Sequence, residues 1–135
     1  MPAGSSSDQL VCLTDLMATV AEITGQDLDW NAGEDSYSFL PFITGGEAVT
    51  AVRDNLVVQS VSGKYSIRKD NWKLLLCKGS GGWSSPGEPG DPEGSLYNLA
   101  EDPGETNNLY LAKPEKVKEL TGLLEMYQQE RRSRY

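Results

Sequence analysis

Two stretches decide the fold of this chain: SIRKDNWKLL at residues 66–75 and LYNLAEDPGETNNL at residues 96–109. In the first, β-favouring residues flank the turn-forming letters KDN, which predicts two antiparallel strands joined by a tight turn. The second begins with a short strand at residues 96–99, at or near the sheet edge. It continues into DPGE at residues 102–105, where Pro and Gly occupy the central positions of a type II turn and end the sheet.

Other segments extend and cover the predicted sheet. Residues 56–61 are rich in β-branched side chains, and a turn at 62–64 leads into a strand at 65–68, so the sheet has about four strands. Residues 78–95, crowded with Gly, Ser and Pro, are too long for an ordinary hairpin connection and are either functional or disordered. After Pro114, an apolar stripe predicts a long C-terminal helix across one face of the sheet: Val117, Leu120, Leu123, Leu124 and Tyr127.

The N-terminal part predicts helices. Apolar side chains recur at helical spacing over residues 13–24, Asp15 or the threonine before it can cap the start, and Gly25 can end the helix in a left-handed conformation. Residues 36–43 predict one further apolar turn closed by the glycines at 45–46. The predicted fold class is α+β, a small antiparallel sheet with a long C-terminal helix packed on it, plus an N-terminal helix.

Composition limits the function classes. The chain has 135 residues with 20 acidic and 12 basic side chains, and its net charge of -8 opposes non-specific binding to nucleic acid or anionic membranes. No apolar run approaches the ~18 residues of a membrane span, and no secretory signal is present, so this polypeptide as given is not expected to be exported. Without histidine, the commonest general base is missing, which disfavours an independent small enzyme.

The two cysteines, Cys12 and Cys77, have neither the spacing of a zinc site nor the density of a disulfide scaffold. Both lie in apolar segments. We therefore expect buried free thiols, with a disulfide between them as the alternative.

The chain resembles the formylglycine-dependent sulfatases of the arylsulfatase type in several segments that follow one another in order. Residues 8–25 resemble the family helix in which an acidic residue precedes an apolar pair and a threonine, and residues 36–46 resemble the Ser-Leu-Leu-Pro type run that introduces the C-terminal subdomain. Residues 57–77 resemble its strand-turn-strand with Ile-Arg and Trp-Lys-Leu. Residues 96–109 resemble its Leu-Tyr-Asp-Leu and Asp-Pro-x-Glu-x-x-Asn-Leu ending, although Asn98 stands where aspartate is commoner.

The resemblance implies a parent enzyme that hydrolyses aryl or sugar sulfate esters with a formylglycine and a calcium ion. The GSGGW run at residues 79–83 is similar to a bacterial arylsulfatase branch related to N-acetylgalactosamine sulfatases. The Cys-x-Pro-x-Arg motif that yields formylglycine is absent, because Cys12 and Cys77 are not followed by the required Pro and Arg. No catalytic or metal-binding residue is therefore assigned in this chain, and formylglycine and calcium are expected in a catalytic domain outside it.

The resemblance also implies a domain organisation and a partner. Residues 1–50 would belong to the end of the catalytic domain, and residues 51–135 would form the C-terminal subdomain that packs on it. The apolar face of the N-terminal helix needs a covering partner, so we expect an exposed apolar patch or a homodimer. Relatives are often periplasmic, secreted or lysosomal, which leaves the localisation open.

Five residues are candidates for substrate contact in an assembled enzyme. Gln59 and Ser60 stand where relatives often carry a polar pair that could hydrogen-bond a sugar hydroxyl, although both could be solvated strand residues. Trp83 could stack on a sugar ring or pin its loop to the sheet. Arg68 and Lys73 could contact a sulfate, but acidic cross-strand partners are the commoner fate of such residues.

The chain has a second possible function class. It could be a non-catalytic interaction or carbohydrate-binding module derived from a sulfatase subdomain, which would need a complete surface of its own. The N-terminal helix argues against this, because the small sheet offers little to cover its apolar face.

Overall fold

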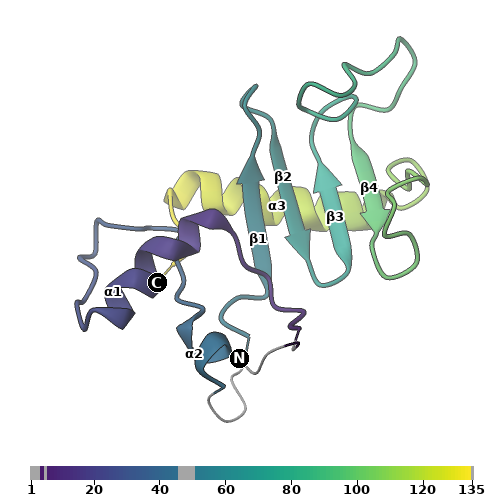
Figure 1. Cartoon of the computed structure of the whole chain (residues 1–135). Coiled ribbons are helices and arrows are strands. Elements are labelled where there is room, and N and C mark those ends of the chain that lie inside the picture. Colours follow the sequence, from purple (N-terminus) through teal and green to yellow (C-terminus); the bar gives the residue numbers. More distant parts are fainter. Residues whose placement is uncertain (1–3, 5, 46–50, 135) are drawn as a thin grey trace. The chain divides into compact units, whose positions relative to one another are not determined.

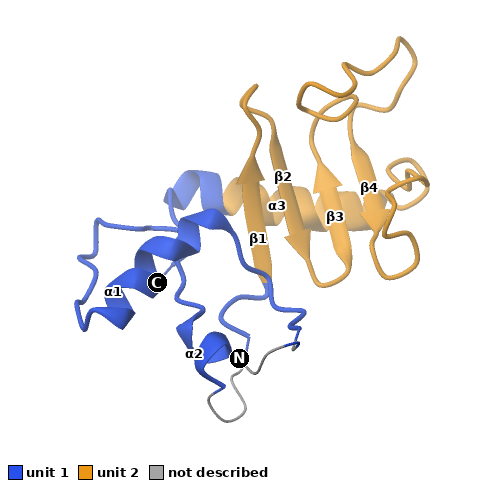
Figure 2. Ribbon diagram, in the orientation of Figure 1, with its two compact units in different colours: residues 1–54, 127–135 blue, residues 55–126 orange. Residues whose placement is uncertain are grey.

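The computed structural model describes residues 4, 6–45 and 51–134 (Figure 1). The elements run in the order 3-10 turn η1 (Leu13–Asp15), α1 (Leu16–Ile23), α2 (Leu40–Thr44), β1 (Asn55–Gln59), β2 (Tyr65–Lys69), β3 (Trp72–Leu75), β4 (Ser95–Asn98) and α3 (Pro114–Glu130). They form two compact units, unit 1 from residues 1–54 and 127–135 and unit 2 from residues 55–126 (Figure 2). The predicted domain boundary at residues 50 and 51 concerns an intact sulfatase and stays a prediction.

Unit 2 is an antiparallel meander with one helix against it. The strand order is β1-β2-β3-β4, so β4 is an edge strand as the sequence predicts. The α3 helix crosses one face of the sheet (Figure 1). The predicted α+β fold class is confirmed, and the observed strand bounds lie within two residues of the predicted ones.

The core of unit 2 lies between the sheet and α3. Ile67 pairs with Leu74 and Leu74 pairs with Leu96, so the three side chains project from one face in a row. All three are fully buried, together with the helix residues Leu120 and Leu124. Burying each such side chain stabilises the fold by roughly 1.5–3 kcal/mol.

Around this core lie the aromatic residues that the sequence places there. Tyr65 and Trp72 pack against the cluster while remaining half-buried, as do Val117 and Leu123 of the predicted helical stripe. The Lys116 ammonium lies 5.9 Å from the centre of the Trp72 ring and 2.5 Å from Glu119. Ile67 thus belongs to the buried core, and the two aromatic residues form its rim.

The turn after β4 differs from the prediction. A type II turn requires a positive φ at Gly104, but the positive φ belongs to Glu105, at 55°. The Asp102 carboxylate accepts hydrogen bonds from the Asn107 N–H at 2.8 Å and from the Thr106 hydroxyl at 3.0 Å. An Asp at the first position of a turn commonly accepts hydrogen bonds from the backbone that follows. Here the bonds that Asp102 accepts favour the positive φ at Glu105, which the Pro-Gly pair alone does not predict.

The long connection between β3 and β4 closes on itself. The Ser80 N–H donates to the Ser85 carbonyl at 2.9 Å. A Cβ built on Gly79 would lie 2.3 Å from that same carbonyl oxygen, so the backbones meet too closely for any side chain there. Gly79 also has a φ of +63°, which favours glycine. By its sequence this segment is either functional or disordered, and the structure shows that the base of the loop is ordered.

Unit 1 contains the predicted helix as two pieces, η1 and α1, followed by the short α2. Gly25 ends α1 with a φ of 67°, as expected. The apolar turn predicted within residues 36–43 is α2, and Gly45 follows it in a left-handed conformation. Gly46, the second predicted closing glycine, lies outside the described residues.

The C-terminal arginines hold a loop of unit 1. The Arg132 guanidinium stacks over the Trp30 ring at 3.8 Å. Arg134 donates to the carbonyls of Asp29 and Ala32, at 3.2 and 2.7 Å. These partners lie about a hundred positions away in the sequence, beyond any local pattern.

Candidate functional site

The predicted polar pair lies at the tip of the β1–β2 hairpin. Gln59 ends β1 and is exposed, while Ser60 begins the turn. The Ser60 hydroxyl accepts a hydrogen bond from the Lys64 N–H and lies 3.1 Å from the Ser62 hydroxyl. Ser60 therefore shapes the turn, and the Gln59 amide stays available to a ligand.

The long loop between β3 and β4, which contains Trp83, lies at the same end of the sheet as the β1–β2 turn (Figure 1). The Trp83 side chain is 90% exposed, so it does not pin the loop to the sheet. A hydrogen bond of 2.6 Å from the Ser62 hydroxyl to the Gly81 carbonyl joins the hairpin tip to this loop. The structure thus brings Gln59, Ser60 and Trp83 to one end of unit 2.

Arg68 and Lys73 form a separate group in the middle of the sheet. They are direct cross-strand partners on β2 and β3, and Tyr97 is the next partner on β4. These residues alternate with the core leucines and isoleucine, so they lie on the face opposite α3. The Lys73 ammonium binds the Glu105 carboxylate at 2.6 Å, so it has an acidic partner, although this partner lies in the turn after β4 and not on a neighbouring strand.

Arg68, the other cation of this group, has one donor without an acceptor among the described residues. Its Nε atom is buried, and within the described part of the chain it has no hydrogen bond. A buried donor left unsatisfied costs about 1–3 kcal/mol. Of the two predicted sulfate contacts, Arg68 is therefore the one whose donors need an acceptor.

A cleft of about 600 Å³ opens on this same sheet face. Its floor is formed by β3 and β4, with Lys73 and Tyr97 among the floor residues. One wall comes from the long loop and includes Asp91, and the other comes from the turn after β4 and includes Glu105. Sequence reasoning missed this cleft because its walls come from three segments, although strand alternation already places Tyr97 beside Lys73.

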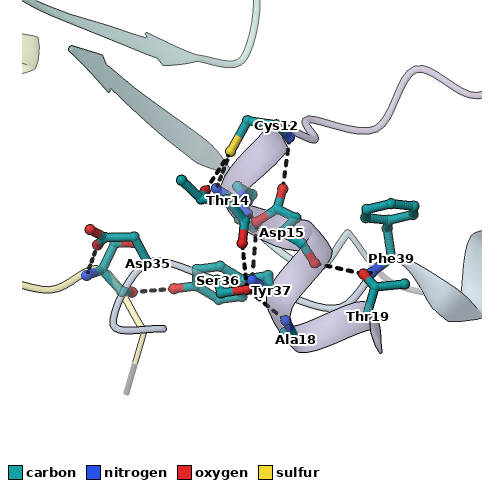
Figure 3. Close-up of polar contacts among 11 residues, drawn as sticks. Cys12, Thr14, Asp15, Ala18, Thr19, Asp35, Ser36, Tyr37 and Phe39 are labelled. Atoms are coloured by element: carbon teal, nitrogen blue, oxygen red, sulfur yellow. Dashed lines mark hydrogen bonds and ion pairs between the residues drawn. The ribbon is translucent and has the colours of Figure 1, made fainter. Parts of the chain in front are cut away.

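A buried polar cluster organises unit 1 around Asp15 (Figure 3). The Asp15 side chain is fully buried and forms an ion pair with Arg53, whose side chain is 5% exposed. It also accepts the N–H groups of Cys12 and Tyr37, at 2.8 and 3.0 Å. Asp15 acts as the third residue of a capping box at η1, where its carboxylate accepts the Cys12 N–H, but it makes no side-chain cap bond at the start of α1 as the sequence predicts. The bonds to Tyr37 and Arg53 add a tertiary role.

Two hydroxyl groups extend this cluster along α1. Ser36 donates to the Thr14 carbonyl and accepts the Ala18 N–H, at 2.7 and 2.8 Å. Thr19 accepts the Phe39 N–H at 3.1 Å. The segment after the loop is therefore fixed to α1 through polar groups.

The phenol of Tyr37 belongs to the edge of the same unit. Its hydroxyl donates to the Ser133 carbonyl, and the Arg53 guanidinium lies 4.5 Å from its ring centre. Burial raises the pKa of Tyr37 above its ordinary value of 10.0, because the phenolate would lose its hydration.

The apolar face of α1 is exposed in unit 1. Exposed fractions are 85% for Leu13, 54% for Val20 and 61% for Ile23, and Leu16 and Met17 are each 49% exposed. The predicted apolar patch is therefore present on this chain. No helix among the described residues combines the length and hydrophobicity of a transmembrane span.

The cysteines and acidic residues of the described part of the chain form no disulfide and no metal-binding group. Both cysteines are free thiols, with Cys77 buried and Cys12 half-buried and 2.8 Å from the Thr14 hydroxyl. Among the described residues, no three metal-binding side chains gather to hold an ion. Asp15, the most buried carboxylate, already binds Arg53 and two backbone N–H groups, so it does not fit a calcium site.

Known proteins share both the sequence pattern and the arrangement of sheet and helices of this chain. The sequence is 31% identical over 114 residues to N-acetylgalactosamine-6-O-sulfatase of Bacteroides thetaiotaomicron. The chain is a sulfatase homologue. A Bacteroides thetaiotaomicron 6S-sulfatase structure, described with the metabolism of multiple glycosaminoglycans, shares the fold with a TM-score of 0.67 and 30% identity over 85% of this chain. No family model matches the sequence.

A second sulfatase structure shows the same fold at lower identity. It was solved with its substrate D-glucosamine-2-N,6-O-disulfate and superposes with a TM-score of 0.61 and 23% identity over 85% of this chain. The homologue match covers 82% of this chain, yet the chain spans only 22% of that relative and 23–24% of these two structures. The chain thus corresponds to a part of a sulfatase, consistent with the C-terminal fragment that its motifs predict.

Proposed function

We propose that this chain is the C-terminal part of a sulfatase, and that the whole enzyme hydrolyses sulfate esters of sugars or aryl alcohols. The observation that carries the proposal is the one-sided match, which covers most of this chain and less than a quarter of each relative. The relative with 31% identity acts on N-acetylgalactosamine-6-O-sulfate by its name, so a 6-O-sulfated amino sugar is the first substrate to test.

The partner in this proposal is the sulfatase catalytic domain. The exposed apolar face of α1 supports it, because a monomer gains little from leaving Leu13, Val20 and Ile23 in water. A homodimer through the same face is the competing arrangement. The two differ in stoichiometry, and the relatives' much greater length favours the catalytic domain.

Catalysis in the proposed enzyme belongs to the partner. A formylglycine would supply the nucleophile, and a calcium ion would neutralise charge on the sulfate group, both within the catalytic domain. This chain would shape the substrate pocket. Gln59 offers an amide and Trp83 an exposed ring. Ser60 orders the turn after Gln59, and Arg68 offers a buried Nε–H beside Lys73 that has no hydrogen bond within the described residues.

The test is complementation with the Bacteroides thetaiotaomicron relative. Its catalytic portion, lacking the segment that matches this chain, is produced alone, together with this chain, and fused to it. Calcium and the formylglycine-forming enzyme are supplied. Hydrolysis of a chromogenic aryl sulfate and of N-acetylgalactosamine-6-sulfate is measured, and a catalytic portion with its nucleophilic Cys replaced by Ala is the control.

Activity that needs both parts supports the proposal, and Arg68→Ala should then lower it. Activity of this chain alone would overturn it. If the folded chain forms a stable homodimer and does not bind the catalytic portion, the homodimer arrangement is favoured instead. Light scattering after size-exclusion chromatography distinguishes these stoichiometries.

A further inference from the structure

The cleft on the sheet face opposite α3 has three lining residues that the proposed sulfatase role does not use, Tyr97, Asp91 and Glu105. Its volume of about 600 Å³ lies within the range of small-molecule sites and accommodates one or two sugar rings. Tyr97 contributes a half-buried aromatic ring to the floor, and Asp91 and Glu105 contribute carboxylates to opposite walls. We propose that this cleft binds a neutral, hydroxyl-rich saccharide.

The free hydrogen-bonding capacity of the cleft points to hydroxyl groups. Asp91 accepts the Glu88 N–H through Oδ2, and Glu105 binds Lys73 through Oε1. The second oxygen of each carboxylate and the Tyr97 hydroxyl have no partner among the described residues. A saccharide presents several hydroxyl groups at close spacing, each able to donate to a carboxylate and accept from a phenol.

The charge of the lining argues against an anionic ligand. Two carboxylates face the cleft, and its single ammonium group, that of Lys73, is already paired with Glu105 at 2.6 Å. A phosphate or sulfate placed here would meet an unpaired Asp91 carboxylate in a chain of net charge -8. A neutral sugar avoids this repulsion and gains charge-assisted hydrogen bonds.

The walls are held in place before any ligand arrives. The Asn108 side chain accepts the N–H groups of Leu96 and Tyr110, at 3.0 and 2.9 Å, and donates to the Gly94 carbonyl at 3.2 Å. On the loop side, the Ser80 hydroxyl accepts the Ser85 N–H at 3.1 Å. Because these residues bind the backbone, ordering the site on binding costs little, which favours measurable affinity for a small ligand.

The Tyr97 ring supplies the apolar contact that sugar recognition also needs. One face of a pyranose ring presents C–H groups, and an aromatic side chain covers them at small entropic cost. Tyr97 lies on β4 as the direct cross-strand partner of Lys73, and both residues line the cleft together with Glu105. The inference concerns the chain by itself, so it stands or falls separately from the sulfatase proposal.

The test is an amide NMR titration of the full 135-residue chain with lactose and with N,N′-diacetylchitobiose. We expect saturable shifts at Asp91, Tyr97 and Glu105 with a dissociation constant on the order of 1 mM for at least one sugar. Tyr97→Ala should weaken binding about tenfold, and Tyr97→Phe should weaken it less because the ring remains. Thr121→Ala, on α3, is the matched control that should leave binding unchanged.

Each remaining outcome decides the question. If the loss of amide dispersion shows that Tyr97→Ala does not fold, Asp91→Asn on the exposed loop is titrated in its place. This variant keeps one acceptor oxygen and removes the charge, so it should weaken binding. Absence of saturable shifts with both sugars would overturn the proposal. So would shifts centred on Trp83 instead of the cleft, or binding seen only with a sulfated sugar.

Discussion

The two units of this chain distribute their apolar and polar residues in opposite ways. In unit 2, the buried side chains are mainly aliphatic and the charged ones lie at the surface. In the described part of unit 1, the buried residues are Asp15, Thr19 and Ser36, while the apolar face of α1 is exposed. Unit 2 has a hydrophobic core of its own, whereas unit 1 is held by polar bonds and presents its apolar surface outward.

This contrast shows which part of the chain depends on something else. A domain gains most of its stability from apolar burial, and unit 1 leaves that gain unused. The homology to proteins of which this chain spans less than a quarter supplies a reason, since a larger body could cover α1. Unit 2 should therefore be the more stable unit in isolation.

The largest effect is expected at the centre of unit 1. Asp15→Ala leaves the Arg53 guanidinium buried without its counter-charge and two backbone N–H groups without an acceptor, which should cost about 3–5 kcal/mol of unfolding free energy. Denaturant unfolding measures the loss, and amide hydrogen exchange locates it in unit 1.

Two comparisons sharpen this experiment. Asp8→Ala, at an exposed position, should change the unfolding free energy by less than about 0.5 kcal/mol. Replacing both partners, in Asp15→Leu with Arg53→Met, should recover part of the loss, because no unpaired charge remains. An Asp15→Ala variant as stable as the Asp8 control would mean that the polar cluster does not hold unit 1 together.

A smaller effect is expected from Leu74→Ala in unit 2, about 3 kcal/mol, because a fully buried side chain leaves a cavity. Val20→Ala on α1, where the side chain is 54% exposed, should cost less than about 0.5 kcal/mol. Urea unfolding of both variants gives the comparison directly. Equal losses would contradict the contrast between the units, since they would place Val20 in a packed interior.

The smallest effect concerns Asp102, in the turn after β4. The Asn107 N–H, followed by the Thr106 groups, lowers the pKa of Asp102 below its ordinary value of 3.8, because these donors stabilise the carboxylate. A lowered pKa contributes stability above pH 3.8, and this contribution is lost as the pH falls through the folded-state pKa. A carboxyl NMR titration should give a midpoint below 3.8, and Asp102→Asn should flatten the acid limb of the stability profile. A midpoint at or above 3.8 would show that the turn bonds do not persist in solution.

The sequence predicts the elements of unit 2 well because their signals are local. Alternation around Ile67 and Leu74 identifies the core face, and the apolar stripe after Pro114 identifies the helix that covers it. The end of α1 at Gly25 is also a local signal, because glycine readily adopts the left-handed conformation that ends a helix.

The missed features depend on partners distant in sequence or on competing bonds. Nothing near Asp15 indicates that Arg53 is its counter-ion, and Arg134 meets its carbonyl partners far upstream. The Pro-Gly pair predicts a type II turn, but the bonds from Asp102 decide otherwise. The cleft needs three segments to meet. The site roles of Gln59 and the other four candidates stay predictions.

The close approach of the Gly79 and Ser85 backbones divides the long loop into a fixed base and an exposed tip. The base admits no side chain at Gly79, whereas residues 82–84, with Trp83 at their centre, are exposed. Substitutions at the base should therefore destabilise the fold, whereas substitutions at the tip should have little effect on its stability. Related proteins can diverge in what the tip displays while inheriting the same sheet, and a new recognition segment grafted at residues 82–84 would enter the fold without disturbing its core.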